Sequence, residues 1–233
     1  MLCSGESQIQ KRQVYEMKKK NRMIPWSALG LLGAFGLWTA AVCVVDVQPI
    51  GPLGSSVGFA SLNQWFHGLT GVHWKMYILT DWLSIVPLLI VAGFGLLGLC
   101  QWVRRRSIRR VDGSILLLGG FYILVMGAFL LFELVKVNYR PVLIEGVLEA
   151  SYPSSTTMLA LCVMSTTILQ IRQRVANRAL RSLGCALSGV FALFMVVGRM
   201  ISGVHWLTDI IGGGLLSGGL VALYRFAVRS KTE

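Results

Sequence analysis

His205 and Asp209 could form a nucleophile and its orienting partner near the C-terminal end of this sequence. They are four residues apart, so on a helix Asp209 can accept the proton of one imidazole nitrogen and leave the other directed at a substrate. Arg199 stands just before them, in a stretch that is otherwise almost wholly apolar. Polar side chains in such surroundings are costly unless they are paired or functional. On its own this pattern suits a catalytic pair and a purely structural pair of histidine and aspartate equally well, because both have the same spacing.

A second candidate segment, KVNYRP (Lys136–Pro141), carries two basic residues that suit a phosphate group. Lys136 and Arg140 are four residues apart and would share one face if the preceding helix continued that far. The guanidinium of Arg140 can donate hydrogen bonds to two phosphate oxygens at once, and Lys136 can add a point charge. This segment therefore predicts a binding site for an anion.

The third segment, SYPSSTTM (Ser151–Met158), has the pattern of a helix start. Pro153 suits the first turn of a helix. The hydroxyl groups of Ser154, Ser155 and Thr156, together with the unpaired N–H groups of the helix N-terminus, could bind an anion. The same residues could also serve only to cap the helix. Because all three segments have phosphate-binding chemistry, their combination says more than any one of them.

These segments are embedded in a chain with the composition of an integral membrane protein. Of its 233 residues, 55% are hydrophobic and 14% are charged, and the mean hydropathy is +0.66, whereas about a quarter of the residues of a soluble domain are charged. We expect an all-α, polytopic membrane protein whose six transmembrane helices form one domain at residues 23–233. We also expect an interfacial helix between the first two spans, in the loop Asp46–Trp82. The six apolar windows are Pro25–Val45, Leu83–Val103, Ile115–Val135, Ser155–Ile171, Leu183–Val197 and Leu207–Val228.

The basic residues are distributed unequally along the chain. The net charge is +12, and most of the 22 Lys and Arg residues fall in the N-terminal tail (residues 1–22), the loops after the second and fourth windows, and the C-terminal end. Basic residues beside spans mark the cytoplasmic side, so we expect both termini in the cytoplasm and the candidate segments on the extracytoplasmic face. This pattern suits a bacterial inner membrane, whose anionic lipids would contact the basic loops, and it argues against nucleic-acid binding. The exceptions are Lys75, Lys136, Arg140 and Arg199.

The sequence has no pattern for a metal, a haem or a disulfide framework. Its five cysteines are scattered without a CxxC pair, and no acidic cluster offers oxygen ligands. His67 and His73 fall in the amphipathic loop before the second window, where we expect them at the membrane interface. We therefore expect no cofactor and no metal.

The three segments resemble the signature motifs of the type 2 phosphatidic acid phosphatase (PAP2) superfamily, KxxxxxxRP, PSGH and SRxxxxxHxxxD. Arg199, His205 and Asp209 keep the spacing of the third motif, with Gly198 at the position of its serine. The order of the motifs and the six-helix frame fit as well. The resemblance extends over about Pro25–Val228 and makes the chain similar to the membrane lipid phosphatases of the superfamily.

This resemblance implies a role for each matching residue. His205 would attack phosphorus to form a phosphohistidine, and Asp209 would orient it. Arg140 and Arg199 would hold the phosphoryl oxygens. Ser154 and the neighbouring N–H groups would stabilise the charge of the transition state.

Two positions depart from the family motifs. Glu133 stands where the family has its lysine, so Lys136 is the nearest candidate for that role. Ser155 and Thr156 occupy the positions of the glycine and the histidine of PSGH. In the family this histidine is the general acid, and threonine cannot replace it, because its hydroxyl is far too weakly acidic.

The missing acid affects the choice of substrate. An alkoxide that leaves from phosphatidic acid is a very strong base and must be protonated as it leaves. A lipid phosphate that leaves from a diphosphate has a pKa of about 6 and needs little protonation. We therefore expect a lipid diphosphate such as undecaprenyl diphosphate as substrate. Three alternatives stay open: a phosphatase for phosphatidic acid or other lipid phosphomonoesters, with His67 or His73 as the acid; a lipid-binding relative without turnover; and a phosphotransferase with a lipid acceptor.

Overall fold

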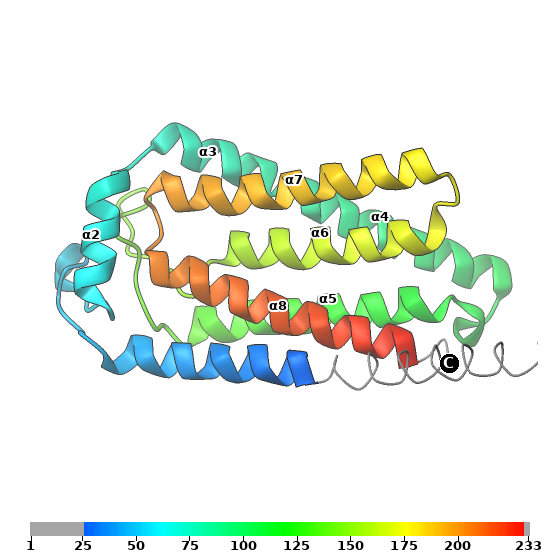
Figure 1. Ribbon diagram of the computed structural model, residues 1–233, viewed down its shortest axis with the longest axis horizontal. Coiled ribbons are helices and arrows are strands. Elements are labelled where there is room, and N and C mark those ends of the chain that lie inside the picture. Colours follow the sequence, from blue (N-terminus) through cyan, green and yellow to red (C-terminus); the bar gives the residue numbers. More distant parts are fainter. Residues whose placement is uncertain (1–25, 231–233) are drawn as a thin grey trace, which may run out of the picture.

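The computed structural model of the protein describes residues 26–230, and the predicted basic tail at residues 1–22 lies outside them. In the described part of the chain all regular elements are helices, joined by loops with isolated β-bridges, as the all-α prediction expected. The long helices run side by side along one axis (Figure 1). In chain order the helices are Trp26–Val44, α2 (Ala60–Thr70), α3 (Trp74–Leu83), α4 (Ile85–Arg105), α5 (Gly113–Leu134), α6 (Ser155–Arg174), α7 (Arg178–Ser202) and α8 (Leu207–Ser230), with short 3-10 turns at Pro52–Gly54 and Ile108–Arg110.

The described helices confirm an integral membrane protein. Within residues 26–230, five helical segments are long and apolar enough to cross a membrane. The helix α7 extends beyond the expected fifth window at both ends, because the polar residues at its two ends continue the helical backbone. The five segments are Trp26–Val44, Trp74–Arg105, Gly113–Leu134, Arg178–Ser202 and Leu207–Ser230.

The helix α6 occupies the expected fourth window but is less apolar than the other long helices. It contacts α4, α5, α7 and α8, and Figure 1 shows it between α7 and α8. Its polar side chains find partners inside the bundle: Thr166 Oγ1 donates to a carbonyl one turn earlier (2.8 Å), and Gln170 Nε2 donates to the hydroxyl of Tyr224 (2.7 Å). A helix that is surrounded by protein does not need a wholly apolar surface, which explains its lower hydropathy.

The loop in which the sequence predicts an interfacial helix contains two helices, α2 and α3. The helix α2 lies across one end of the bundle, and α3 packs against α7 (Figure 1). Only Ser84, whose backbone is itself helical (φ −62°, ψ −16°), separates α3 from α4. The second apolar segment therefore begins at Trp74 rather than at the expected Leu83, and it is 32 residues long.

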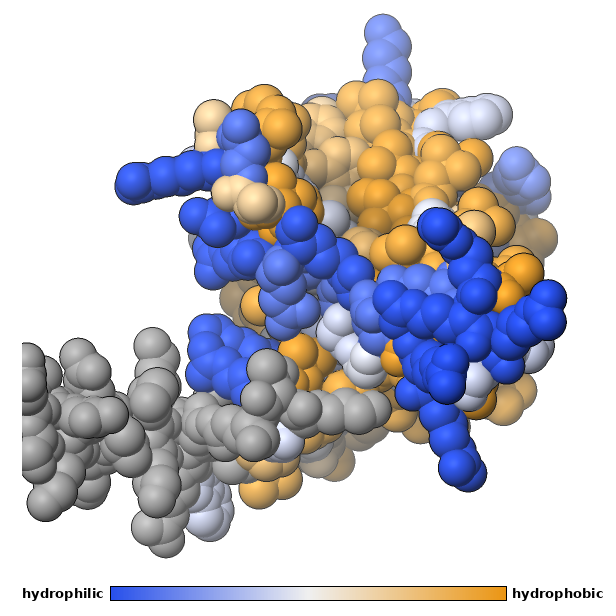
Figure 2. Space-filling model, turned by 90° about the vertical axis from the view of Figure 1, so that its right-hand side faces the viewer, coloured by the Kyte–Doolittle hydropathy of each residue, from blue (hydrophilic) through white to orange (hydrophobic). Residues whose placement is uncertain are grey.

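The two ends of the bundle differ in character. The loops that follow α4 and α6 and the C-terminal end of α8 lie at one end, whereas α2 and the loops that carry the candidate segments lie at the other (Figure 1). Hydrophilic side chains gather around the apolar bundle at the first of these ends (Figure 2). The basic loops are thus grouped together, opposite the candidate site.

Close packing fixes the turn between α7 and α8, which carries His205. Gly203 has φ +69°, and a Cβ atom there would lie 1.8 Å from the carbonyl oxygen of Gly71. The N–H group of His73 also donates to the carbonyl of Ser202 (3.0 Å). Only glycine fits position 203, because it tolerates the left-handed backbone and leaves room for the neighbouring chain.

Candidate active site

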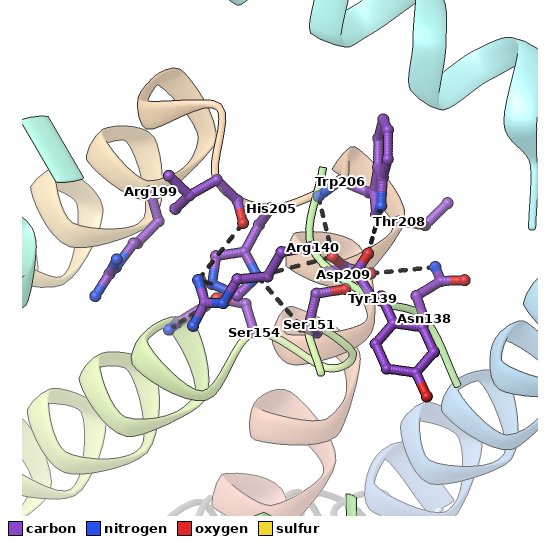
Figure 3. Close-up of polar contacts among 12 residues, drawn as sticks. Asn138, Tyr139, Arg140, Ser151, Ser154, Arg199, His205, Trp206, Thr208 and Asp209 are labelled. Atoms are coloured by element: carbon purple, nitrogen blue, oxygen red, sulfur yellow. Dashed lines mark hydrogen bonds and ion pairs between the residues drawn. The ribbon is translucent and has the colours of Figure 1, made fainter. Parts of the chain in front are cut away.

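His205 lies in the turn between α7 and α8, and only 4% of it is exposed. Its Nδ1 lies 3.2 Å from the carbonyl oxygen of Ser151, and its Nε2 lies 3.2 Å from Nη1 of Arg140 (Figure 3). A carbonyl oxygen can only accept a hydrogen bond, and a guanidinium can only donate one. The imidazole proton therefore belongs on Nδ1, and Nε2 has a lone pair that faces the guanidinium.

The surroundings of His205 favour its neutral form. Burial removes the hydration of the imidazolium, and the positive charge of Arg140 opposes a second positive charge beside it. These two effects lower the pKa of His205 to about 4, although Asp209 acts in the opposite direction. A neutral imidazole with a free lone pair is the form that can act as a nucleophile.

Asp209 is fully buried in the first turn of α8 and holds the turn that precedes this helix. Its Oδ2 accepts the N–H of Trp206 (3.0 Å), and its Oδ1 accepts the amide of Asn138 (3.3 Å). The same Oδ2 lies 3.7 Å from Nδ1 of His205, which is an ion-pair distance but too long for a hydrogen bond. The expected contact from Asp209 to the imidazole is thus electrostatic, and the carbonyl of Ser151 supplies the hydrogen bond that orients the ring.

Arg140 reaches His205 from the loop between α5 and α6. Its backbone N–H donates to the carbonyl of Glu149 (3.0 Å), next to an isolated β-bridge between Tyr139 and Ala150. Its Nε lies 2.9 Å from a carboxylate oxygen of Glu149. The pairing of the two loop segments therefore fixes the guanidinium beside Nε2 of His205.

Arg199 lies in the last turn of α7, and its side chain is only 2% exposed. Its Nη2 lies 2.8 Å from Oδ1 of Asp81, and its guanidinium carbon lies 5.0 Å from the centre of the Tyr77 ring. Its Nε and Nη1 are buried and have no hydrogen-bond partner. Unpaired buried donors are costly, so these two groups are well suited to receive an anion.

Lys136 does not lie where the sequence predicts it. The expectation that it shares a helical face with Arg140 fails because α5 ends at Leu134, and the backbone from there to Arg140 is not helical. Lys136 is exposed, and its Nζ lies 5.9 Å from the centre of the Tyr139 ring. No contact joins it to His205 or Arg199 in the structure.

The segment that contains Ser154, Ser155 and Thr156 forms the N-terminus of α6, as predicted. Ser154 is the N-cap residue, and its buried hydroxyl accepts the N–H of Thr157 (3.4 Å). The N–H of Ser154 donates to the backbone carbonyl of Asp209 (3.1 Å), which joins the starts of α6 and α8. Ser155 lines a small hollow that His205 also lines.

A groove continues from this hollow along the bundle between α4, α5 and α6. It has a volume of about 270 Å³, and Asp81, Ser155 and Thr156 lie at its polar end. At Val91 and Tyr122 it adjoins a second apolar hollow of about 440 Å³ between α4 and α5, which extends to the end of the bundle that carries the basic loops. We call this groove and the second hollow, which share Val91 and Tyr122, the apolar channel.

The two other histidines lie outside the contacts of His205. The ring of His67, on α2, lies 5.5 Å from the ring of Trp206, and its Nδ1 is buried without a partner. His73 is exposed just before α3. Among residues 26–230, no group of three or more His, Cys, Asp or Glu side chains could hold a metal ion.

Several residues of the site could not be found from the sequence. Glu149 and Asp81 each hold one of the two arginines, and Asn138 holds Asp209. The carbonyl of Ser151 orients the imidazole. Of these residues, only Asp81 has a feature in the sequence that could have singled it out, because it is an acidic residue within a largely apolar segment.

The fold and the site together define a membrane-embedded helical protein with a histidine and two arginines at one end of its bundle. Residues 135–232 match the sequence model of the PAP2 superfamily. The fold is similar to the crystal structure of the first transmembrane PAP2 type phosphatidylglycerolphosphate phosphatase from Bacillus subtilis, with a TM-score of 0.57, 18% identity, and coverage of 89% of this chain and 97% of that chain. No curated protein matches the sequence.

These comparisons confirm the resemblance that the sequence motifs indicated. The matched region contains Arg140, Arg199, His205 and Asp209. Residues 135–232, the C-terminal part of the chain, are thus similar to the PAP2 superfamily.

Proposed function

We propose that the protein hydrolyses a lipid diphosphate, of which undecaprenyl diphosphate is an example, through a phosphohistidine on the extracytoplasmic face of the membrane. The observation that carries this proposal is the neutral tautomer of buried His205, with Nε2 only 3.2 Å from Nη1 of Arg140. A nucleophile and a cation thus lie within reach of one phosphoryl group.

In the first step, Nε2 of His205 attacks the terminal phosphorus of the diphosphate. The bond between Nε2 and phosphorus forms, and the bond to the bridging oxygen breaks, so that this oxygen leaves with its electron pair on the lipid monophosphate. The imidazole becomes positive, and it is stabilised by the carbonyl of Ser151 and the carboxylate of Asp209, at 3.2 and 3.7 Å from Nδ1. Water then displaces the histidine and releases inorganic phosphate.

The two arginines and the start of α6 would hold the phosphoryl oxygens. Arg199 has two buried donors without partners, and Arg140 already faces the nucleophile. The first N–H groups of α6, near Ser155, add the partial positive charge of a helix N-terminus. Donors that are fixed before the reaction stabilise the charge that develops on the oxygens.

The residue at the start of α6 favours a diphosphate over a phosphomonoester. Thr156 lines the groove beside the site, where its hydroxyl cannot donate a proton to a poor leaving group at neutral pH. A lipid phosphate leaves without such help, because its pKa is about 6. Neither His67 nor His73 contacts His205 or Arg140, so no histidine of the described chain takes the place of the acid in this structure.

The apolar channel between α4 and α5 suits the hydrocarbon tail of such a lipid. It begins beside Ser155 and Thr156 and continues past Val91 and Tyr122. A long tail could therefore lie along the bundle while the headgroup reaches His205. The tail passes from the apolar bilayer to an apolar surface of the protein, so it never has to enter water.

We further propose that α6 crosses the membrane with the five apolar segments, which gives six spans. The basic loops after α4 and α6 would then lie in the cytoplasm with both termini, and the site would face outward. The position of α6 inside the bundle and the grouping of the basic loops at one end support this topology.

Phosphate release by the full-length protein in lipid nanodiscs tests this function. We expect release from undecaprenyl diphosphate to exceed release from phosphatidic acid by about 10²-fold or more, since the lack of a general acid costs about 10²- to 10⁴-fold. His205→Ala should abolish release, whereas His73→Ala, at an exposed histidine, should retain it.

Other outcomes would replace this function. A preference for phosphatidic acid would indicate a phosphomonoesterase. Lipid binding without any phosphate release by the wild-type protein would indicate a relative without turnover. Transfer of the phosphoryl group to an added lipid alcohol, with little free phosphate, would indicate a phosphotransferase.

A further inference from the structure

Asp81 lies at the edge of the candidate site, although it is distant from the three motifs in the sequence. It belongs to the last turn of α3, and its Oδ1 lies 2.8 Å from Nη2 of Arg199. It lines the same groove as Ser155 and Thr156, at the start of α6. Its side chain is 59% exposed at the surface of the protein. Asp81 thus contacts both Arg199 and the groove that begins at the start of α6.

The second step of the proposed reaction needs a group that accepts a proton. A diphosphate avoids the need for an acid in the first step, but the water that attacks the phosphohistidine must still lose a proton. Thr156 cannot accept this proton, because a hydroxyl is a very weak base. His205 cannot accept it either, because its Nε2 is bonded to phosphorus and its Nδ1 is protonated during this step.

We infer that Asp81 is the general base that activates water for hydrolysis of the phosphohistidine. This inference rests on the proposed function. The water oxygen forms a bond to phosphorus as its proton passes to the carboxylate of Asp81. The bond from phosphorus to Nε2 of His205 breaks, and its electron pair returns to the imidazole. Inorganic phosphate leaves, and Asp81 then releases its proton to solvent.

The contacts of Arg199 place Asp81 close to a bound phosphoryl group. Nη2 of Arg199 holds the carboxylate, while Nε and Nη1 are buried and unpaired. A phosphoryl group bound at either of these donors shares the guanidinium of Arg199 with Asp81. In Figure 3, His205 lies between Arg199 and Asp209, so the guanidinium of Arg199 is on the side of the imidazole away from the carboxylate of Asp209. Water near Asp81 could therefore approach phosphorus from the side away from Asp209.

Glu149 is the other carboxylate that holds a phosphate-binding arginine, and it provides a comparison. It lies 2.9 Å from Nε of Arg140, and its side chain is 42% exposed. It does not line the groove that Asp81 shares with Ser155 and Thr156. We therefore assign Glu149 to the positioning of Arg140 and Asp81 to the activation of water.

Rapid-mixing kinetics with a lipid diphosphate labelled at its terminal phosphorus separate the two steps. In Asp81→Asn we expect a burst of lipid monophosphate close to one per protein, accumulation of labelled His205, and phosphate release slowed by about 10²- to 10⁴-fold. Asp81→Glu should recover part of the phosphate release. Glu149→Gln should slow the burst without accumulation of phosphohistidine, and the exposed Lys75→Ala should behave as the wild type.

The outcomes distinguish this inference from the function on which it rests. If Asp81→Asn slows the burst and the phosphate release equally, with no accumulation of phosphohistidine, Asp81 only positions Arg199 and the inference is overturned. A burst in Asp81→Asn also proves that this variant is folded. If the wild-type protein itself gives neither a burst nor phosphohistidine, both the proposed function and the role of Asp81 are contradicted.

Discussion

Nε2 of His205 and Nη1 of Arg140 lie 3.2 Å apart, with the guanidinium as the donor and the imidazole lone pair as the acceptor. This contact occupies the nucleophile when no substrate is bound. A phosphoryl group that draws the N–H groups of Arg140 to its own oxygens also frees the lone pair of His205. The same arginine can therefore bind the substrate and uncover the nucleophile.

Substitution of Arg199 and Lys136 should have different effects. Arg199→Ala removes a buried guanidinium with two donors available for phosphate, and charge-assisted hydrogen bonds of this kind contribute about 1.5–3 kcal/mol. We expect kcat/KM for the lipid diphosphate to fall by about 10- to 100-fold. Lys136→Ala, at an exposed residue, should change it by less than about twofold. Equal losses in the two variants would show that Lys136 also binds the substrate.

The titration of His205 should be displaced toward acid. Because burial and Arg140 lower its pKa to about 4, the imidazole stays neutral and nucleophilic at any pH above that value. NMR of histidine labelled with ¹⁵N should show one of the three imidazoles with a midpoint near 4, and His205→Ala should remove that signal. A midpoint near the ordinary value of about 6.5 would mean that solvent reaches His205 freely.

Restoration of the family histidine should widen the range of substrates. Thr156→His places an imidazole at the start of α6, where it could protonate an alkoxide leaving group. We expect release of phosphate from phosphatidic acid to rise by about 10-fold or more, with little change for the lipid diphosphate. The ratio of kcat/KM for the two substrates measures this effect, and Ser165→His, further along the same helix, serves as the control. An unchanged ratio would indicate that the missing acid does not decide the substrate.

A bulky residue in the channel should weaken the binding of substrates with long lipid tails. Gly95 lines the apolar hollow between α4 and α5, and a Cβ atom there meets nothing within 4 Å. Gly95→Phe should therefore fit without backbone strain and fill part of the channel. We expect KM to rise for undecaprenyl diphosphate but not for a short-chain diphosphate. Gly93→Phe, at a glycine that is also free of neighbours but does not line the hollow, should affect neither substrate.

The positions of three candidate residues at helix starts could be predicted because they depend on short spacings within single elements. His205 and Asp209 flank the start of α8, and Ser154 caps α6, so local helix rules place them. The composition predicted a helical membrane protein for the same reason, since length and hydropathy are local properties. The less apolar α6 was predicted as a helix, but its central position depends on contacts with four other helices.

The remaining features depend on contacts between distant segments. Lys136 was misplaced because α5 stops at Leu134, where the loop turns to pair with the residues near Glu149. Asp81 reaches Arg199 across more than a hundred residues of sequence, through the packing of α3 on α7. The hydrogen bond from His205 goes to a backbone carbonyl, which no side-chain pattern can reveal.

Detection of phosphate on His205 tests the central claim most directly. The protein would be mixed for a short time with a lipid diphosphate labelled at its terminal phosphorus, quenched in alkali, which preserves phosphohistidine, and digested for mass spectrometry. We predict a labelled peptide that contains His205, absent from His205→Ala and increased in Asp81→Asn. Release of labelled phosphate by the wild-type protein without any label on His205 would contradict the proposed mechanism.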